Sequence, residues 1–285
     1  MSKPRPFNIN IFVAEGIPDG LRIVTKSNWI GQALVCPRSR YPEVKSRTEF
    51  QHSGIYLLVG RSEADDQPLL YIGEAETVRT RLDSHYANKD FWTQAVIFTT
   101  TSNSLNKAEV QFLEARLVEL ATEYKRCALD NGNTPQRPSL SESEEAEVEG
   151  YLDELRSLLP VLGITAFAPV SAGRRGQRRY HLKSDEWNAT GYVTSNGFAV
   201  QAGSQARGTT VPSADTYVKV RNQLIADGLL VEEGEGFRLI ADHEFNSPSA
   251  AATVFQGRNS NGRTDWKDAQ GVSLKAHQEQ EAESP

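Results

Sequence analysis

The central part of the chain contains five side chains whose chemical types suit hydrolysis of a phosphodiester bond. In sequence order they are two phenols, a guanidinium, an imidazole and a carboxylate: Tyr56, Tyr71, Arg81, His85 and Glu114. The reaction requires an activated water, neutralisation of charge on the phosphate and help for the leaving oxygen. Because the set has a group for each requirement, we treat it as a candidate catalytic set.

Each of the five side chains has an expected role. Arg81 and His85 are four residues apart in a helical pattern, so they share one face. The planar guanidinium of Arg81 suits phosphate oxygens, and His85 can relay a proton near neutral pH. Glu114 is the expected metal ligand, and a single carboxylate completed by water and substrate oxygens favours Mg²⁺ or Mn²⁺ over Zn²⁺. Near a cation, a tyrosine hydroxyl becomes acidic enough to relay a water proton.

The elements expected to position these residues form a small β-β-α-β-α domain. Two apolar strands at 54–60 and 69–73, joined by a polar loop, predict a β-hairpin. Helical spacing begins after residue 74, and residues 94–101 are typical of a third strand. The clearest helix is predicted over 106–125, where apolar residues recur at i, i+3, i+7 and i+10. The expected domain spans residues 51–135.

The strings Gly-Ile-Tyr at 54–56 and Tyr-Ile-Gly at 71–73 give this domain a resemblance to the GIY-YIG nuclease superfamily. Arg81 and His85 follow at the family's spacing, and Glu114 falls where the family keeps its metal-binding glutamate. The resemblance implies an endonuclease in which Tyr56 acts as the base and Tyr71 orients water or phosphate.

The family also has an asparagine after the last helix. Asn131 and Asn133 are both candidates for that supporting position, and Asn133 is preferred. Fifteen residues separate the two tyrosines, a few more than is usual in the family, because of the polar loop between the strands.

The fold class expected for the whole chain is mixed α+β, with further segments on both sides of the catalytic domain. Residues 1–50 are expected to be a β-rich N-terminal extension that packs on it as an added sheet. Residues 136–163 are expected to be an acidic helical spacer, and 164–275 a small α+β accessory domain. The tail at 276–285 is expected to be disordered.

The accessory segment has its own signature at 245–268. The block SPSAAATVFQGRNSNGRTDWK resembles a C-terminal domain of unknown function that accompanies GIY-YIG domains in bacterial proteins. This block could bind nucleic acid through contacts with its phosphate backbone and stacking on a base. The residues involved would be Arg258, Asn261, Trp266 and Lys267. The alternative, equally favoured, is that Asn261 begins a turn and Trp266 covers a small core.

A basic stretch at 174–179 is the second candidate for contact with nucleic acid. Its charged side chains are Arg174, Arg175, Arg178 and Arg179. We interpret it as a loop that follows phosphates, with an ordinary solvated loop as the alternative.

The overall charge does not decide whether nucleic acid is a partner. The net charge is −6, but the acidic residues concentrate in 141–155 and in the C-terminal tail. DNA is the expected substrate, an RNA substrate or a catalytically silent DNA-binding scaffold is the alternative, and the acidic helix at 141–156 is a candidate surface for a protein partner.

Cysteine usage and hydropathy bear on the compartment. Cys36 and Cys127 are far apart and lack metal-site spacing, which favours reduced thiols. No apolar run approaches the length of a membrane-spanning helix, and residues 1–10 lack the apolar core of a signal peptide. A cytoplasmic location without membrane contact is therefore expected.

Overall fold

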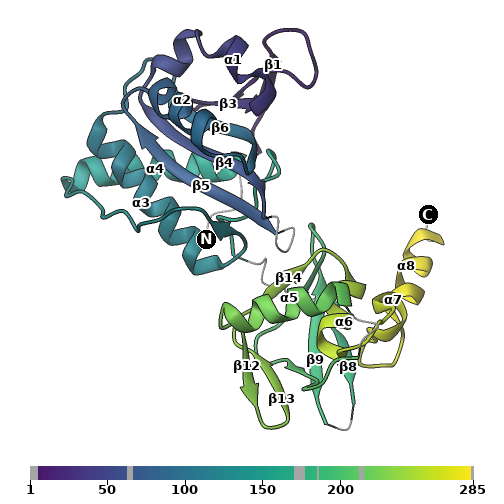
Figure 1. The fold of residues 1–285 in the computed structure, drawn as a ribbon. Coiled ribbons are helices and arrows are strands. Elements are labelled where there is room, and N and C mark those ends of the chain that lie inside the picture. The colour runs from purple at the N-terminus through teal and green to yellow at the C-terminus, as the bar shows by residue number, and fades with distance from the viewer. Residues whose placement is uncertain (1–5, 63–66, 170–176, 185, 212–214, 284–285) are drawn as a thin grey trace. The chain divides into compact units, whose positions relative to one another are not determined.

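A β-hairpin at the centre of the chain forms as the sequence predicts, and the larger sheet is built around it. β4 (Gly54–Arg61) and β5 (Pro68–Ala75) pair antiparallel, with Tyr56 opposite Gly73. The computed structural model describes residues 6–62, 67–169, 177–184, 186–211 and 215–283. The chain divides into two units, Met1–Ala168 and Pro169–Pro285, and both mix helices with strands, which confirms the α+β class (Figure 1).

The first unit contains a seven-stranded sheet in the order β1-β2-β3-β6-β4-β5-β7. The other strands are β1 (Ile9–Val13), β2 (Arg22–Lys26), β3 (Gly31–Pro37), β6 (Trp92–Thr100) and β7 (Ala128–Leu129). All neighbours pair antiparallel except β5 and β7, which are parallel. β3 pairs with β6, so the first three strands continue the sheet that contains the β4–β5 hairpin. The described part of residues 1–50 is therefore β-rich as expected, but its strands extend this sheet and do not form an added sheet packed on it.

Helices cover both faces of this sheet because its central strands are apolar on both sides. The short α1 (Tyr41–Val44) and α2 (Val78–Asn88) contribute to the core on one face, together with Tyr56 and Leu58. On the other face α3 (Lys107–Tyr124) and α4 (Glu142–Leu158) pack against Ile55 and Leu57. Two short 3-10 helices, Arg38–Arg40 and Thr48–Gln51, flank α1.

Capping residues explain where the two long helices begin. The Asn106 side chain accepts a hydrogen bond from the Glu109 N–H at the start of α3, and the Glu109 carboxylate accepts one from the Asn106 N–H; Ser141 and Glu144 form the same reciprocal pair for α4. The acidic face of α4 is solvated, but its apolar face, which includes Leu152 and Leu155, is buried in the core. The expected acidic spacer at 136–163 is therefore an integral helix of the first unit.

The second unit contains two small antiparallel sheets. One has the order β14-β10-β9-β8 and the other β11-β13-β12. Their strands are β8 (Tyr180–Lys183), β9 (Asn188–Val193), β10 (Phe198–Val200), β11 (Gln205–Ala206), β12 (Leu230–Glu233), β13 (Gly236–Leu239) and β14 (His243–Phe245). The helices are α5 (Asp215–Ala226), α6 (Pro248–Gln256), α7 (Gly262–Asp265) and α8 (Leu274–Glu283).

The core of the second unit is centred on α6. Ser247 caps this helix, Pro248 occupies its first turn, and Gly257 ends it in a left-handed conformation. All residues from Ala250 to Gln256 are buried. The C-terminal segment expected to be disordered instead forms α8, because Leu274 is buried in the core and the His277 imidazole lies 2.6 Å from the Asp268 carboxylate.

Candidate active site

The two tyrosines of the candidate set lie side by side on the β4–β5 hairpin. Their ring centroids are 6.2 Å apart with the planes stacked at 26°. Tyr56 is only 1% exposed, whereas Tyr71 is half-buried. Burial raises the pKa of Tyr56 above its usual range, Tyr71 adds to this, and the positive charge of Arg81 opposes it. The Tyr56 hydroxyl is therefore protonated at neutral pH unless a further positive charge lies beside it.

His85 contacts both tyrosines from α2. Its Nε2 lies 2.9 Å from the Tyr56 hydroxyl, and its ring centroid is 4.7 Å from that of Tyr71. Burial, and then the charges of Lys89 and Arg81, lower the pKa of His85 to about 4. The imidazole is therefore neutral at physiological pH, and a neutral Nε2 can accept a hydrogen bond from the Tyr56 hydroxyl.

Glu114 reaches the same region from α3. Burial and the neighbouring carboxylate of Glu74 raise the pKa of Glu114 to about 7, although a hydrogen bond from the Glu74 backbone and the charge of Arg81 oppose the shift. A second carboxylate beside Glu114 is a feature that the sequence analysis missed. The available signal was its position, directly after the Tyr-Ile-Gly string.

Arg81 is exposed on α2 and lines a hollow beside this carboxylate pair. The hollow is also lined by Glu74, Thr80 and Lys107. Among the described residues, no carboxylate forms an ion pair with Arg81, so its guanidinium is free to bind an anion. Lys107 forms only an exposed ion pair with Glu76, at 3.3 Å. The five predicted catalytic residues are thus linked by direct contacts and by their mutual effects on pKa.

The chain after α3 supports the hairpin from one side. Lys89 lies over the Tyr71 ring, 4.6 Å from its centroid, and forms an ion pair with Asp130. The Asn131 side chain accepts a hydrogen bond from the Ile72 N–H and donates one to the Ile72 carbonyl, at 3.0 and 2.8 Å. Asn133 is exposed and makes no such contact in the structure. The supporting asparagine is therefore Asn131, and the preference for Asn133 is wrong.

Oxygen atoms are the available metal ligands in this region. Across the described ranges, no group of three or more His, Cys, Asp or Glu side chains is placed to hold a metal ion. The Glu74 and Glu114 carboxylates repel one another, and a bound cation would relieve that repulsion. This donor set fits an oxygen-preferring divalent cation that keeps most of its waters.

The candidate nucleic-acid contacts in the second unit have mixed outcomes. Trp266 is fully buried: its indole N–H donates to the Pro248 carbonyl at 3.0 Å, and its ring lies 4.6 Å from that of Phe198. Its predicted stacking on a base is therefore wrong. The Asn261 side chain caps α7, as the alternative interpretation predicted. Arg258 and Lys267 are exposed and line a common groove.

The basic stretch is only partly described. Arg174 and Arg175 lie outside the described residues. Arg178 forms an exposed ion pair with Glu281, at 3.0 Å, and the Arg179 guanidinium lies 4.3 Å from the centroid of the Tyr192 ring. The two described arginines thus have partners within the second unit.

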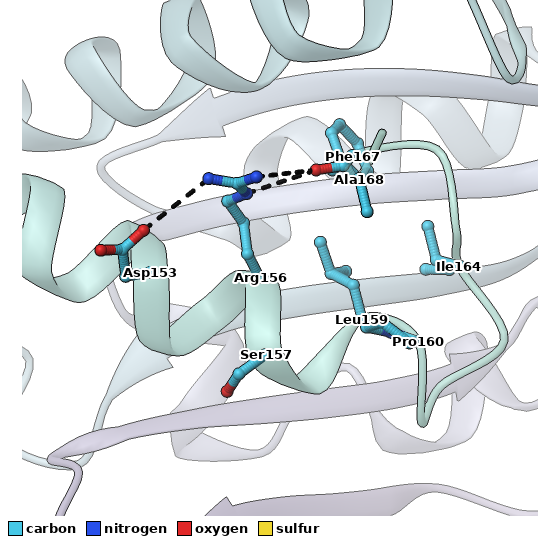
Figure 2. Close-up of a pocket in the computed structure, with 8 residues that line it drawn as sticks. All are labelled: Asp153, Arg156, Ser157, Leu159, Pro160, Ile164, Phe167 and Ala168. Atoms are coloured by element: carbon cyan, nitrogen blue, oxygen red, sulfur yellow. Dashed lines mark hydrogen bonds and ion pairs between the residues drawn. The ribbon is translucent and has the colours of Figure 1, made fainter. Parts of the chain in front are cut away.

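Figure 2 shows a further hollow in the first unit, where α4 meets the segment that follows it. Arg156 donates from Nε and Nη2 to the Phe167 carbonyl, at 3.3 and 3.2 Å, and lies 3.7 Å from the Asp153 carboxylate. These contacts fix the chain after α4. None of the five candidate catalytic residues lines this hollow, and we interpret it as structural.

Comparison with known proteins identifies part of the second unit. Residues 180–278 match the family model of a domain of unknown function, DUF4357. This match confirms the resemblance of the C-terminal part to such a domain, whereas no GIY-YIG domain is detected. No curated protein and no solved structure matches the chain. None of the helices described here is both long and apolar enough to cross a membrane.

Proposed function

We propose that the first unit is a metal-dependent endonuclease of the GIY-YIG type that hydrolyses phosphodiester bonds in DNA. The observation that carries this proposal is the convergence of Tyr56, Tyr71 and His85. These side chains come from two strands and a helix, and a hydrogen bond of 2.9 Å joins the first to the third. Glu114, 58 residues after Tyr56 in the chain, acts electrostatically on Tyr56.

Proton transfer is assigned to the Tyr56–His85 pair. A buried phenol is a weak base on its own, but a divalent cation beside it, together with Arg81, would lower its pKa, and the hydrogen bond to His85 orients the phenol oxygen. Tyr56 would then accept the proton of the attacking water, and Tyr71, half-exposed at the edge of the pair, would orient that water or a phosphate oxygen.

Neutralisation of the charge on the phosphate is assigned to Arg81. Its guanidinium has no carboxylate partner among the described residues, and it lines the hollow that Glu74 and Lys107 also line. A planar fork of N–H donors suits two phosphate oxygens and stabilises the charge that accumulates in the transition state.

Glu114 and Glu74 would hold the divalent cation. A bound Mg²⁺ or Mn²⁺ would polarise the scissile phosphate and make a water more acidic. The elevated pKa of Glu114 supports this role, because a carboxyl that is costly to ionise alone becomes stable as an anion beside a cation.

The direct test is plasmid cleavage by the full chain and by the variant Glu114→Gln, in Mg²⁺, Mn²⁺ or EDTA. Glu123→Gln is the matched control, since Glu123 is an exposed carboxylate on the same helix. We expect nicking or linearisation by the wild type and by Glu123→Gln, only with metal, and none by Glu114→Gln. Equal cleavage by Glu114→Gln would overturn the mechanism. Inactivity of the wild type on plasmid, branched and single-stranded DNA, and on RNA of equal length, would overturn the nuclease itself.

A further inference from the structure

The second unit has a groove of about 470 Å³ between the β8–β9 hairpin and the segment that follows α6. Two backbone hydrogen bonds join His181 on β8 to Lys267, at 2.6 and 3.1 Å, and both residues line the groove. Lys183, two residues after His181, and Arg258, directly after the cap of α6, also line it. The groove thus brings together cations from three separate parts of the chain.

These three cations are available to a ligand. Lys183, Arg258 and Lys267 are all exposed. Within the described part of the second unit, no side-chain hydrogen bond or ion pair engages any of the three. In contrast, Arg238 is paired with Glu233, at 2.7 Å, and Arg178 with Glu281. The three cations of the groove therefore differ from Arg238 and Arg178, because no carboxylate within the described part of this unit is paired with them.

The two carboxylates that also line the groove, Asp265 and Asp268, are hydrogen-bonded within the second unit. Asp265 accepts hydrogen bonds from the Gln256 amide and the Thr264 hydroxyl, at 3.1 and 3.2 Å. Asp268 lies 2.6 Å from the His277 imidazole and accepts two backbone N–H bonds, both at 2.9 Å. The groove is lined by three cations and these two carboxylates, so its net charge is positive and favours an approaching anion.

An aromatic side chain, Trp187, also lines the same groove. Trp187 is half-buried against the core of the second unit, and two hydrogen bonds with Ser184 hold its backbone in the β8–β9 turn. It lines this groove and also a neighbouring hollow whose carboxylates include Glu186, Glu233 and Glu235. That hollow also contains Arg207 and Arg238, the latter paired with Glu233, so its lining has a net negative charge, whereas the groove has a net positive one.

We propose that this groove binds a single strand of nucleic acid, with a base stacked on Trp187 and successive phosphates beside Lys183, Lys267 and Arg258. An aromatic side chain and several unpaired cations in one groove are the combination that single strands require, because every base offers a flat face and every nucleotide a negative charge. The site goes beyond the cleavage proposed above: it lies wholly in the second unit and needs no metal. It also replaces Trp266, which is buried, with Trp187 as the stacking residue.

Binding is measured by fluorescence anisotropy of a labelled 12-nucleotide single-stranded DNA. The full chain carries Glu114→Gln as background, and the buffer contains EDTA, so that no cleavage competes. Three phosphate contacts predict a slope of log K against log salt of about −2. The double variant Lys183→Gln/Lys267→Gln leaves one phosphate contact and should make that slope shallower, about −0.7. Trp187→Leu keeps an apolar group against the core and should weaken binding by about 5- to 150-fold.

Lys219→Gln is the matched control, because Lys219 is an exposed cation on α5 outside the groove. We expect it to bind like the background protein. An RNA strand of the same sequence shows which polymer is preferred, and a blunt duplex and a phosphoserine peptide of equal charge should bind more weakly than the single strands. Equal binding by the duplex or the peptide would overturn the assignment, as would an affinity unchanged by the lysine pair or by Trp187→Leu.

The binding experiment and the cleavage experiment test the two proposals independently. Metal-dependent cleavage combined with unaltered binding by the groove variants would retain the nuclease and reject the groove. Binding that is lost only in the groove variants would retain the groove, whether or not the wild type cuts DNA.

Discussion

The phenol ring of Tyr56 lies directly across the backbone of Gly73. A methyl group at position 73 would come within 2.4 Å of both the hydroxyl oxygen and the Cζ atom of Tyr56. The two residues are opposite one another in the β4–β5 register. The glycine of the second motif string therefore provides the space in which the tyrosine of the first string reaches His85.

Gly73→Ala should consequently displace Tyr56 and destabilise the first unit. Tyr56 is buried and cannot move away without disturbing its neighbours, so we expect a loss of about 1–3 kcal/mol, as for other overpacked sites. Calorimetric unfolding should show a lower transition temperature for one transition only, which would identify the first unit.

Gly150→Ala is the control for the chemical change itself. Gly150 lies in α4, and a Cβ there meets nothing within 4 Å. The substitution should stabilise the helix by about 0.5–1 kcal/mol. Gly73→Ala behaving like Gly150→Ala would contradict the close packing of Tyr56.

Asn131→Ala should weaken the hairpin, whereas Asn133→Ala should not. The Asn131 amide satisfies the N–H and carbonyl of Ile72, and its removal leaves buried backbone groups unpaired, at a cost of about 1–3 kcal/mol. Asn133 is exposed, so its substitution should change the free energy of unfolding by about 0.5 kcal/mol or less. Chemical denaturation of both variants measures the difference, and a larger effect at Asn133 would refute the assignment.

These two asparagines show where a sequence pattern stops being informative. The β4–β5 hairpin, β6 and α3 follow from local signals of strand alternation, helical periodicity and capping, and their predicted positions agree with the structure. Asn131 and Asn133, however, are residues of the same type in one polar turn. Only the position of that turn beside β5 decides which amide reaches the sheet.

Contacts between distant elements account for the other errors. The pairing of β3 with β6 joins segments about sixty residues apart, so local alternation at 7–35 predicts strands but not the sheet that they enter. Glu74 was missed because its significance depends on α3 bringing Glu114 beside it. Trp266 follows a polar run that is typical of an exposed turn, yet Phe198 from β10 and the Pro248 carbonyl enclose it.

Arg81→Ala should impair catalysis more than folding. Its guanidinium is exposed and makes no ion pair with a described carboxylate, so we expect little change in stability. The loss of transition-state stabilisation should be about 2–4 kcal/mol, as for other preorganised charge contacts. Single-turnover cleavage rates measure it, with Arg79→Ala as control, because Arg79 lies on the same helix and contacts Asp83 at 3.6 Å. Arg81→Lys should recover only part of the rate, since the ammonium lacks the fork. Equal rates for Arg79→Ala and Arg81→Ala would remove Arg81 from the site.

Without metal, the stability of the first unit should depend on pH through two groups that act in opposite directions. Glu114 has a pKa of about 7 in the folded state, above its ordinary value near 4.5. Its contribution is therefore fully present below pH 4.5 and is lost as the pH rises through 7. His85 has a folded pKa of about 4, below its ordinary value near 6.5. Its contribution is present above pH 6.5 and is lost as the pH falls towards 4.

Glu114→Gln separates the two effects, because glutamine does not titrate. In EDTA, the unfolding transition that Gly73→Ala identifies should differ little between wild type and Glu114→Gln at pH 4.5. At pH 8 the variant should be more stable, by about 1–3 kcal/mol, since the wild type must then bury an ionised carboxylate beside Glu74. Addition of Mg²⁺ or Mn²⁺ at pH 8 should stabilise the wild type and leave the variant almost unchanged. A wild type that is as stable as the variant at pH 8 without metal would show that Glu114 ionises without cost, and the argument for a cation beside it would fail.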